Sequence, residues 1–212
     1  MRVRILLATN NASISPPVFV QRAIWAGLVL VIAVVLVIAL VRPSARKSLP
    51  VLGVVPEFSL VERSGKAITA ADLKGKPWIA DFVFTRCGNV CPILSARFAR
   101  LQGAVQLVSF SVDPDHDTPA VLQEYAGRFH ADSGGWLFLT GDRVAMDQLI
   151  TKGFDLSVAQ RPEIVGANPN DLVTHSDRFV LVDADLKIRG YYRGTDDDAI
   201  EQILRDVAAL SG

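Results

Sequence analysis

Cysteine is scarce in this sequence, which contains only Cys87 and Cys91. A structural disulfide usually closes a longer loop in a small exported domain, because the stabilisation comes from the chain entropy that loop closure removes. The three residues between these cysteines leave almost no loop to close. We therefore expect the pair to serve chemistry rather than stability.

Acidic residues are missing from the first 50 positions, which hold six lysines and arginines. Sixteen of the 22 basic residues remain for positions 51 to 212, against 22 acidic residues, so this part carries a net charge of −6. Nucleic-acid binding requires the opposite sign. We expect no nucleic-acid partner.

Charged residues and proline are also absent from Ala23 to Val41. As a helix this segment would be roughly 28 Å long, close to the ~30 Å hydrocarbon layer of a membrane. A cleaved signal peptide has a shorter apolar core and small residues at its cleavage site, whereas Val41-Arg42-Pro43 follows here, with no lipobox cysteine. The sequence predicts a short cytoplasmic segment at 1–22, a transmembrane helix at 23–41, a linker at 42–52 and a domain at 53–212.

The domain alternates apolar runs of strand length with helical patterns. The segments Val54 to Leu60 and Ala67 to Thr69 predict a hairpin with its turn at Ser64-Gly65. Further strands are predicted at 78–84, 106–112 and 136–139, helices at 93–101, 119–129 and 144–153, a long loop at 157–171, a hairpin at 179–192 and a last helix at 199–210. This order predicts an α/β sandwich with a mixed sheet.

The two cysteines lie where a predicted strand gives way to a helix. Pro92 suits the first turn of that helix, which places Cys91 at the helix start and Cys87 in the loop before it. Thiols at a helix N-terminus experience the positive end of its dipole, so we expect their pKa to be lowered. A thiolate is both a nucleophile and a metal ligand.

The spacing does not match two familiar redox motifs. A thioredoxin-type pair would need a cysteine at position 90, where Val90 stands, and a peroxiredoxin motif would need proline and threonine in place of Ala80 and Phe84. The additional residue between the cysteines lets both sulfurs point at one site, and a disulfide remains geometrically feasible.

His175 is the candidate third ligand. It lies in the segment just before the predicted strand that begins at Phe179, and a histidine at that place could reach both thiolates. Two thiolates and one imidazole favour copper, especially Cu(I), or zinc, but a structural zinc normally takes four protein ligands. His116 and His130 are predicted to be surface residues. Asp113, Asp115 and Asp117 resemble the start of a calcium loop, but Thr118 stands where an EF-hand loop has its glycine. We expect Asp113 beside the metal ligands.

Three motifs in this order resemble the Sco/SenC family of copper-binding assembly proteins, over roughly residues 54 to 208. They are Phe82 to Cys87 with Cys91-Pro92, Ser111 to Pro119, and Thr174-His175-Ser176, followed by Leu181-Val182-Asp183. The resemblance implies a thioredoxin-like fold that binds copper, as Cu(I) and/or Cu(II), through Cys87, Cys91 and His175. Gly88 stands where the family usually has proline, so we expect a more flexible loop.

The resemblance also implies a location and a partner. The domain is expected in the periplasm, anchored in a bacterial inner membrane rather than a mitochondrial one. The implied partner is the binuclear copper domain of cytochrome c oxidase subunit II, with other periplasmic copper chaperones as further partners. The alternative function is a thiol-disulfide reductase in which Cys87 or Cys91 attacks a partner disulfide. A copper or redox sensor is a third alternative. The short N-terminal segment offers no output module for such a sensor, which argues against it.

Overall fold

The computed structural model describes residues 17–41, 48–88, 90–132, 134–156, 159–160, 173–174 and 177–210. The chain divides into two units, Met1–Arg46 and Lys47–Gly212.

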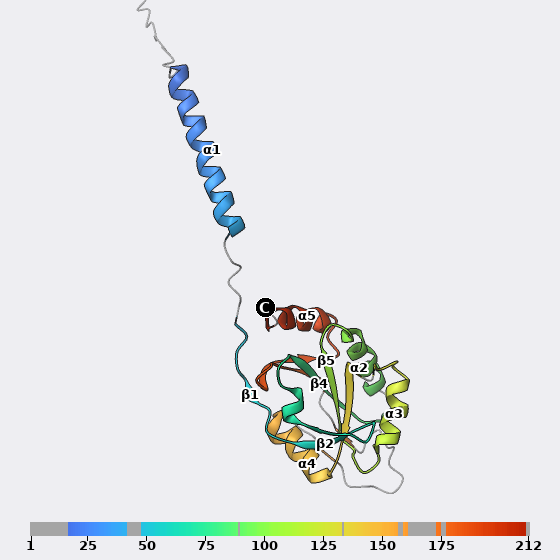
Figure 1. Ribbon diagram of the computed structural model, residues 1–212. Coiled ribbons are helices and arrows are strands. Elements are labelled where there is room, and N and C mark those ends of the chain that lie inside the picture. The colour runs from blue at the N-terminus through green and yellow to red at the C-terminus, as the bar shows by residue number, and fades with distance from the viewer. Residues whose placement is uncertain are drawn as a thin grey trace, which may run out of the picture. The chain divides into compact units, whose positions relative to one another are not determined.

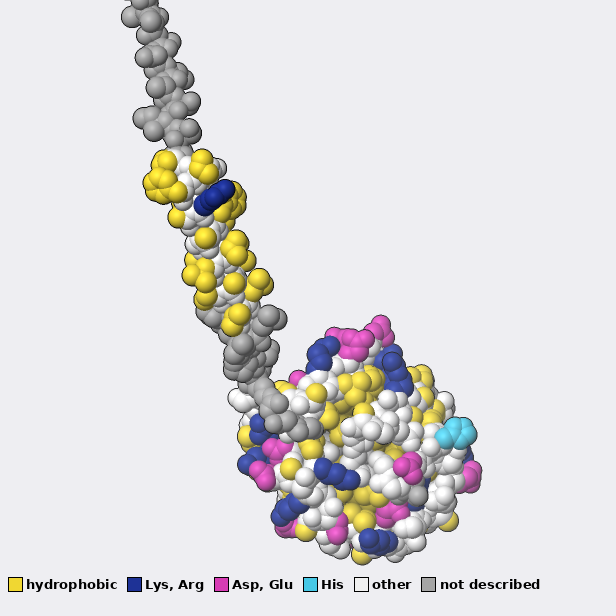
Figure 2. Space-filling model, turned by 45° about the horizontal axis from the view of Figure 1, so that its top comes forward, with side chains coloured by type: hydrophobic (Ala, Val, Ile, Leu, Met, Phe, Trp, Pro, Cys, Tyr) yellow, Lys and Arg dark blue, Asp and Glu magenta, His cyan; other side chains and the backbone are white. Residues whose placement is uncertain are grey.

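The first unit contains helix α1, Val18–Val41. It begins five residues before the expected Ala23 and includes Arg22. Its 24 residues correspond to about 36 Å. Apolar side chains predominate on its visible surface in Figure 2, where a basic side chain also lies. Within the described ranges, α1 is the one helix that is long and apolar enough to cross a membrane.

The second unit is built on an eight-stranded mixed sheet with the strand order β1-β10-β9-β4-β5-β6-β2-β3 (Figure 1). The central strands β4, β5 and β6 are parallel, and the other neighbours are antiparallel. The strands are β1 (Gly53–Val54), β2 (Ser59–Glu62), β3 (Ala67–Thr69), β4 (Trp78–Val83), β5 (Gln106–Ser111), β6 (Trp136–Thr140), β9 (Arg178–Val182) and β10 (Lys187–Arg193). The helical segments are η1 (Ala70–Leu73), α2 (Val90–Phe98), η2 (Ala99–Leu101), α3 (Pro119–Gly127), α4 (Arg143–Gln148), the π-helical η3 (Leu149–Gly153) and α5 (Ala199–Leu210).

Both faces of the sheet are covered, and β4 is buried along its whole length. Alternate residues of a strand point to opposite faces, so Ile79 joins the hydrophobic cluster that includes residues of α2, α3 and α5. Trp78 and Phe82 join the other cluster, which includes residues of η1, α4 and η3. The α/β sandwich with a mixed sheet is thus confirmed.

Most predicted elements are present with small shifts at their ends. Thr118 caps α3 as expected, since its side chain accepts a hydrogen bond from the Val121 N–H. The assignment of Val54 to the first hairpin is wrong, because β1 pairs with β10 instead. A two-residue strand is too short to show a pattern.

The prediction of a continuous loop at 157–171 is wrong at Ala159–Gln160, which form a strand of a small second sheet. Strand β7 (Ala159–Gln160) pairs antiparallel with β8 (Val173–Thr174), which ends immediately before His175. The remainder of the 157–171 loop lies outside the described residues.

Candidate metal centre

The first cysteine closes a tight turn at the end of β4. The Cys87 N–H donates to the carbonyl oxygen of Phe84 at 3.0 Å, which makes Thr85 and Arg86 the two central residues of the turn. Helix α2 begins at Val90, so Cys91 lies in its first turn, as the sequence predicts. The corner between strand and helix therefore brings the two cysteines to one place.

The two sulfurs lie within the protein and close to each other. Cys87 is 8% exposed and Cys91 2%, and both are reduced thiols. The thiol of Cys91 interacts with that of Cys87. Two neighbouring thiols with little contact with water are a suitable donor pair for a soft metal ion.

The expectation of a lowered thiol pKa is wrong for Cys91. Burial raises the pKa of Cys91, the neighbouring thiol of Cys87 raises it further, and a hydrogen bond with the backbone of Phe84 opposes the rise only in part. A helix N-terminus contributes typically 0.3–1 kcal/mol, which is less than the cost of burying a thiolate among apolar side chains. Without a metal ion, Cys91 is a protonated thiol at neutral pH.

Two aspartates after β5 contact the residues immediately before Cys87. The hydroxyl of Thr85 donates to Oδ1 of Asp117, and its backbone N–H lies 3.4 Å from Oδ2. Arg86 donates from Nε and Nη2 to Oδ2 of Asp113, at 3.1 and 2.6 Å. Asp113 also accepts a hydrogen bond from Arg143 at 3.2 Å. Asp113 therefore lies beside the cysteine turn, as predicted, but it acts through Arg86.

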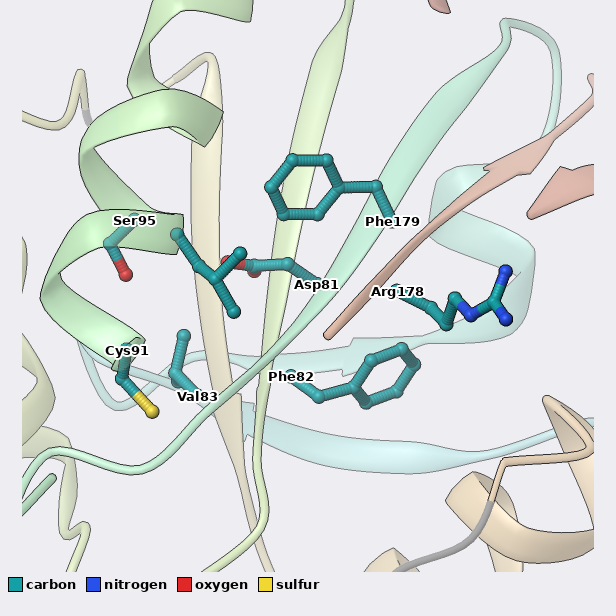
Figure 3. Close-up of a pocket in the computed structure, with 8 residues that line it drawn as sticks. Asp81, Phe82, Val83, Cys91, Ser95, Arg178 and Phe179 are labelled. Atoms are coloured by element: carbon teal, nitrogen blue, oxygen red, sulfur yellow. The ribbon is translucent and has the colours of Figure 1, made fainter. Parts of the chain in front are cut away.

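A buried carboxyl group lies on the strand beneath α2. Figure 3 shows Asp81 projecting from β4 toward the helix that carries Cys91 and Ser95. These three residues line one narrow cavity with no room for a water molecule. Burial raises the pKa of Asp81 to about 7, against the lowering effect of a hydrogen bond from Ser109. Sequence reasoning missed this residue, although an acid inside an apolar strand is a visible signal.

The third predicted ligand, His175, lies outside the described residues. Within the described ranges no group of three or more histidine, cysteine or acidic side chains could hold a metal ion. The structure therefore brings Cys87 and Cys91 together, and the role of His175 stays a prediction. His116 and His130 are exposed, as expected.

Comparison with known proteins identifies the family. The family model for SCO1/SenC matches residues 48–211. The chain belongs to the SCO1/SenC family. Among the family's members, the SCO1 protein homolog of Bacillus subtilis is 32% identical over 165 residues, which cover 74% of this chain and 82% of that protein.

Solved structures of the family share the fold. A SCO1/SenC family lipoprotein from Bacillus anthracis has a TM-score of 0.69 and 34% identity, covering 76% of this chain and 97% of that one. Yeast Sco1 with copper bound has a TM-score of 0.63 and 26% identity, covering 74% of this chain and 89% of that one. The predicted thioredoxin-like fold and Sco/SenC membership are confirmed.

Proposed function

We propose that this SCO1/SenC protein is a copper chaperone that holds one copper ion through Cys87, Cys91 and His175. The observation that carries the proposal is the pair of adjacent, buried, reduced thiols at the corner between β4 and α2. Copper-bound structures of Sco proteins from yeast and other organisms support it.

The chemistry of the two thiols fits this cargo. Cu(I) is a soft ion that prefers thiolate ligands, and burial at the corner shields a bound ion from water. Cys87 lies in the turn and Cys91 in the first turn of α2, so the ligands come from two elements whose ends meet. His175 follows β8 and would supply the imidazole.

We infer that α1 anchors the protein in a membrane, with the copper domain in the periplasm. A helix of about 36 Å exceeds the ~30 Å hydrocarbon layer, and nearly all of its described side chains are exposed. The proposed partner is the binuclear copper domain of cytochrome c oxidase subunit II. The relative BsSco, 32% identical, belongs to the Sco family of cytochrome c oxidase assembly proteins.

Copper loading of residues 47–212 tests the three ligands. This unit has its own hydrophobic core on both faces of the sheet. The fragment is loaded with Cu(I) under a non-thiol reductant, desalted and assayed for bound copper. Cys87→Ser, Cys91→Ser and His175→Ala are each expected to lose most of the metal. His130→Ala is the matched control, since His130 is an exposed histidine outside the corner. Equal copper retention by wild type and His175→Ala would refute the three-ligand site.

A second function, thiol-disulfide reduction, is favoured by the same pair of adjacent reduced thiols. The relative BsSco has a disulfide switch. In this reaction one thiolate attacks a partner disulfide, and the other cysteine then displaces the partner as a thiol and closes the Cys87–Cys91 disulfide. His175→Ala distinguishes the two functions, because it removes a copper ligand and leaves both sulfurs in place. Loss of copper transfer with full reductase activity assigns copper delivery to the three-ligand site.

A further inference from the structure

The turn that carries Cys87 follows the end of β4. One backbone hydrogen bond, from Cys87 to Phe84, closes it. The next residue, Gly88, is exposed and has no side chain that could restrict the loop. Thr85 and Arg86 lie between the two ends of this hydrogen bond, so the contacts that hold them also help to place Cys87.

Both central residues are held by a second turn that follows β5. Thr85 donates its hydroxyl to Asp117, and Arg86 forms its ion pair with Asp113. The two aspartates are close in sequence but contact different residues of the cysteine turn. The contact through Thr85 is the better shielded from water, because Asp117 is fully buried whereas the Arg86 side chain is 39% exposed.

The second turn is itself fixed to the centre of the sheet. The Asp117 N–H donates to the carbonyl oxygen of Asp113 at 2.9 Å. Ser111 is the last residue of β5, and its hydroxyl donates to Asp117 at 2.7 Å. The oxygen of this Ser111 hydroxyl also accepts a hydrogen bond from the Asp113 N–H at 3.0 Å. The Val112 N–H donates to Val83 at 2.9 Å, which joins the ends of β5 and β4. Asp117 is thus a rigid acceptor on a rigid element.

We propose that Asp117, acting through the hydroxyl of Thr85, is a positioning residue that holds Cys87 at the distance from Cys91 that a shared metal ion requires. This inference rests on the proposed function of the two cysteines as copper ligands. A donor pair that is already in place loses little conformational freedom when the ion arrives. The buried carboxylate of Asp117 thereby contributes to the preorganisation of the site.

Substitution at Thr85 isolates this contact. Thr85→Val keeps the shape of the side chain and removes the hydroxyl, whereas Thr85→Ser keeps the hydroxyl. Thr151→Val is the matched control, because it removes an exposed threonine hydroxyl that donates to a backbone carbonyl in another segment. Thr85 is only partly buried, so the valine variant is expected to fold. If it does not, Thr85→Ala carries the same comparison.

Two measurements on residues 47–212 depend on the position of Cys87 relative to Cys91 and therefore test the proposal. The first is Cu(I) affinity by competition with a chromophoric chelator. The second needs no metal: it is the equilibrium in a glutathione buffer, where the two thiols give two electrons and two protons to glutathione disulfide and form the Cys87–Cys91 disulfide. Thr85→Val should bind Cu(I) about tenfold more weakly than wild type. Without the hydroxyl, the backbone of roughly one residue of the turn is free before binding and must be fixed when the ion binds, which costs about a factor of ten in affinity. Its dithiol–disulfide equilibrium should also shift, and Thr85→Ser should restore both values.

The outcomes separate this inference from the proposed function. If folded Thr85→Val matches wild type in both measurements, Asp117 does not position Cys87. An equal loss in Thr151→Val would also overturn the proposal, because the effect would then be general. If wild type itself binds no Cu(I), the proposed function fails, and the dithiol–disulfide equilibrium still decides whether Asp117 positions Cys87.

Discussion

Asp81 accepts a hydrogen bond from the hydroxyl of Ser109 on the neighbouring parallel strand, inside the sheet and out of contact with water. The same hydroxyl oxygen accepts a hydrogen bond from Nε1 of Trp136 at 2.8 Å. The carboxyl group is therefore held in place among large apolar side chains, and its ionisation is costly.

The ionisation of Asp81 should make stability depend on pH. Its pKa rises from 3.8 to about 7 in the folded protein. From about pH 4 to about pH 7 the unfolded chain releases this proton while the folded protein keeps it, so the free energy of unfolding falls as pH rises. Above pH 7 this contribution is constant. With about 1.4 kcal/mol for each pH unit, the total is of the order of 4 kcal/mol.

Asp81→Asn tests this dependence, because the amide oxygen still accepts the hydrogen bond from Ser109. The variant is expected to be more stable than wild type at pH 8 and nearly equal to it at about pH 4. Urea unfolding of the reduced, metal-free domain across this range provides the measurement. Parallel stability curves for the two proteins would contradict the assignment.

Phe98 holds α2 against the sheet and should be essential for stability. Its ring is fully buried, with centroids 5.5 Å from Trp136 and 5.0 Å from Phe179. Phe98→Ala leaves a cavity, and we expect a loss of about 3–5 kcal/mol in the free energy of unfolding. Val144→Ala is the control, since Val144 is 62% exposed and should change stability by less than about 0.5 kcal/mol. Urea denaturation compares the three proteins.

His130 lies in the turn that follows α3 and has a positive φ of 51°. The next residue, Ala131, donates to the carbonyl oxygen of Ala126 at 3.1 Å, which is typical of a helix C-terminus that favours glycine. His130→Gly removes the strain of the side chain but adds freedom to the unfolded chain. The net result should be a gain of about 0.5 kcal/mol, measured as a higher thermal midpoint. His130→Ala keeps a Cβ, so an equal gain there would show that strain is not the cause.

Copper should stabilise the folded domain if the corner binds it. Free ligand at a hundred times its dissociation constant adds about 2.7 kcal/mol to the free energy of unfolding. The thermal midpoint of wild type should therefore rise with Cu(I) and return after chelation, while that of Cys91→Ser should stay constant. A midpoint that rises equally in Cys91→Ser would place the copper elsewhere.

Local sequence patterns predicted most of the elements, because they depend on neighbouring residues. Helix α3 begins at Pro119 with Thr118 as its N-cap, as the capping preferences of these residues predict. The apolar run that starts at Trp78 forms the fully buried strand β4. The placement of Val54 was wrong because its partner strand, β10, lies more than 130 residues away. Pairing over that distance has no local signal.

The sequence alone determined the order of the elements, the corner where Cys87 and Cys91 meet, and the family. Spacing and residue type carry that information directly. Only the tertiary structure decided the environment of the thiols. The raised pKa of Cys91 reflects burial between elements that are distant in sequence, and the contact between Thr85 and Asp117 joins residues 32 positions apart. Solvent exclusion and long-range contacts exist only after the sheet and its helices have assembled.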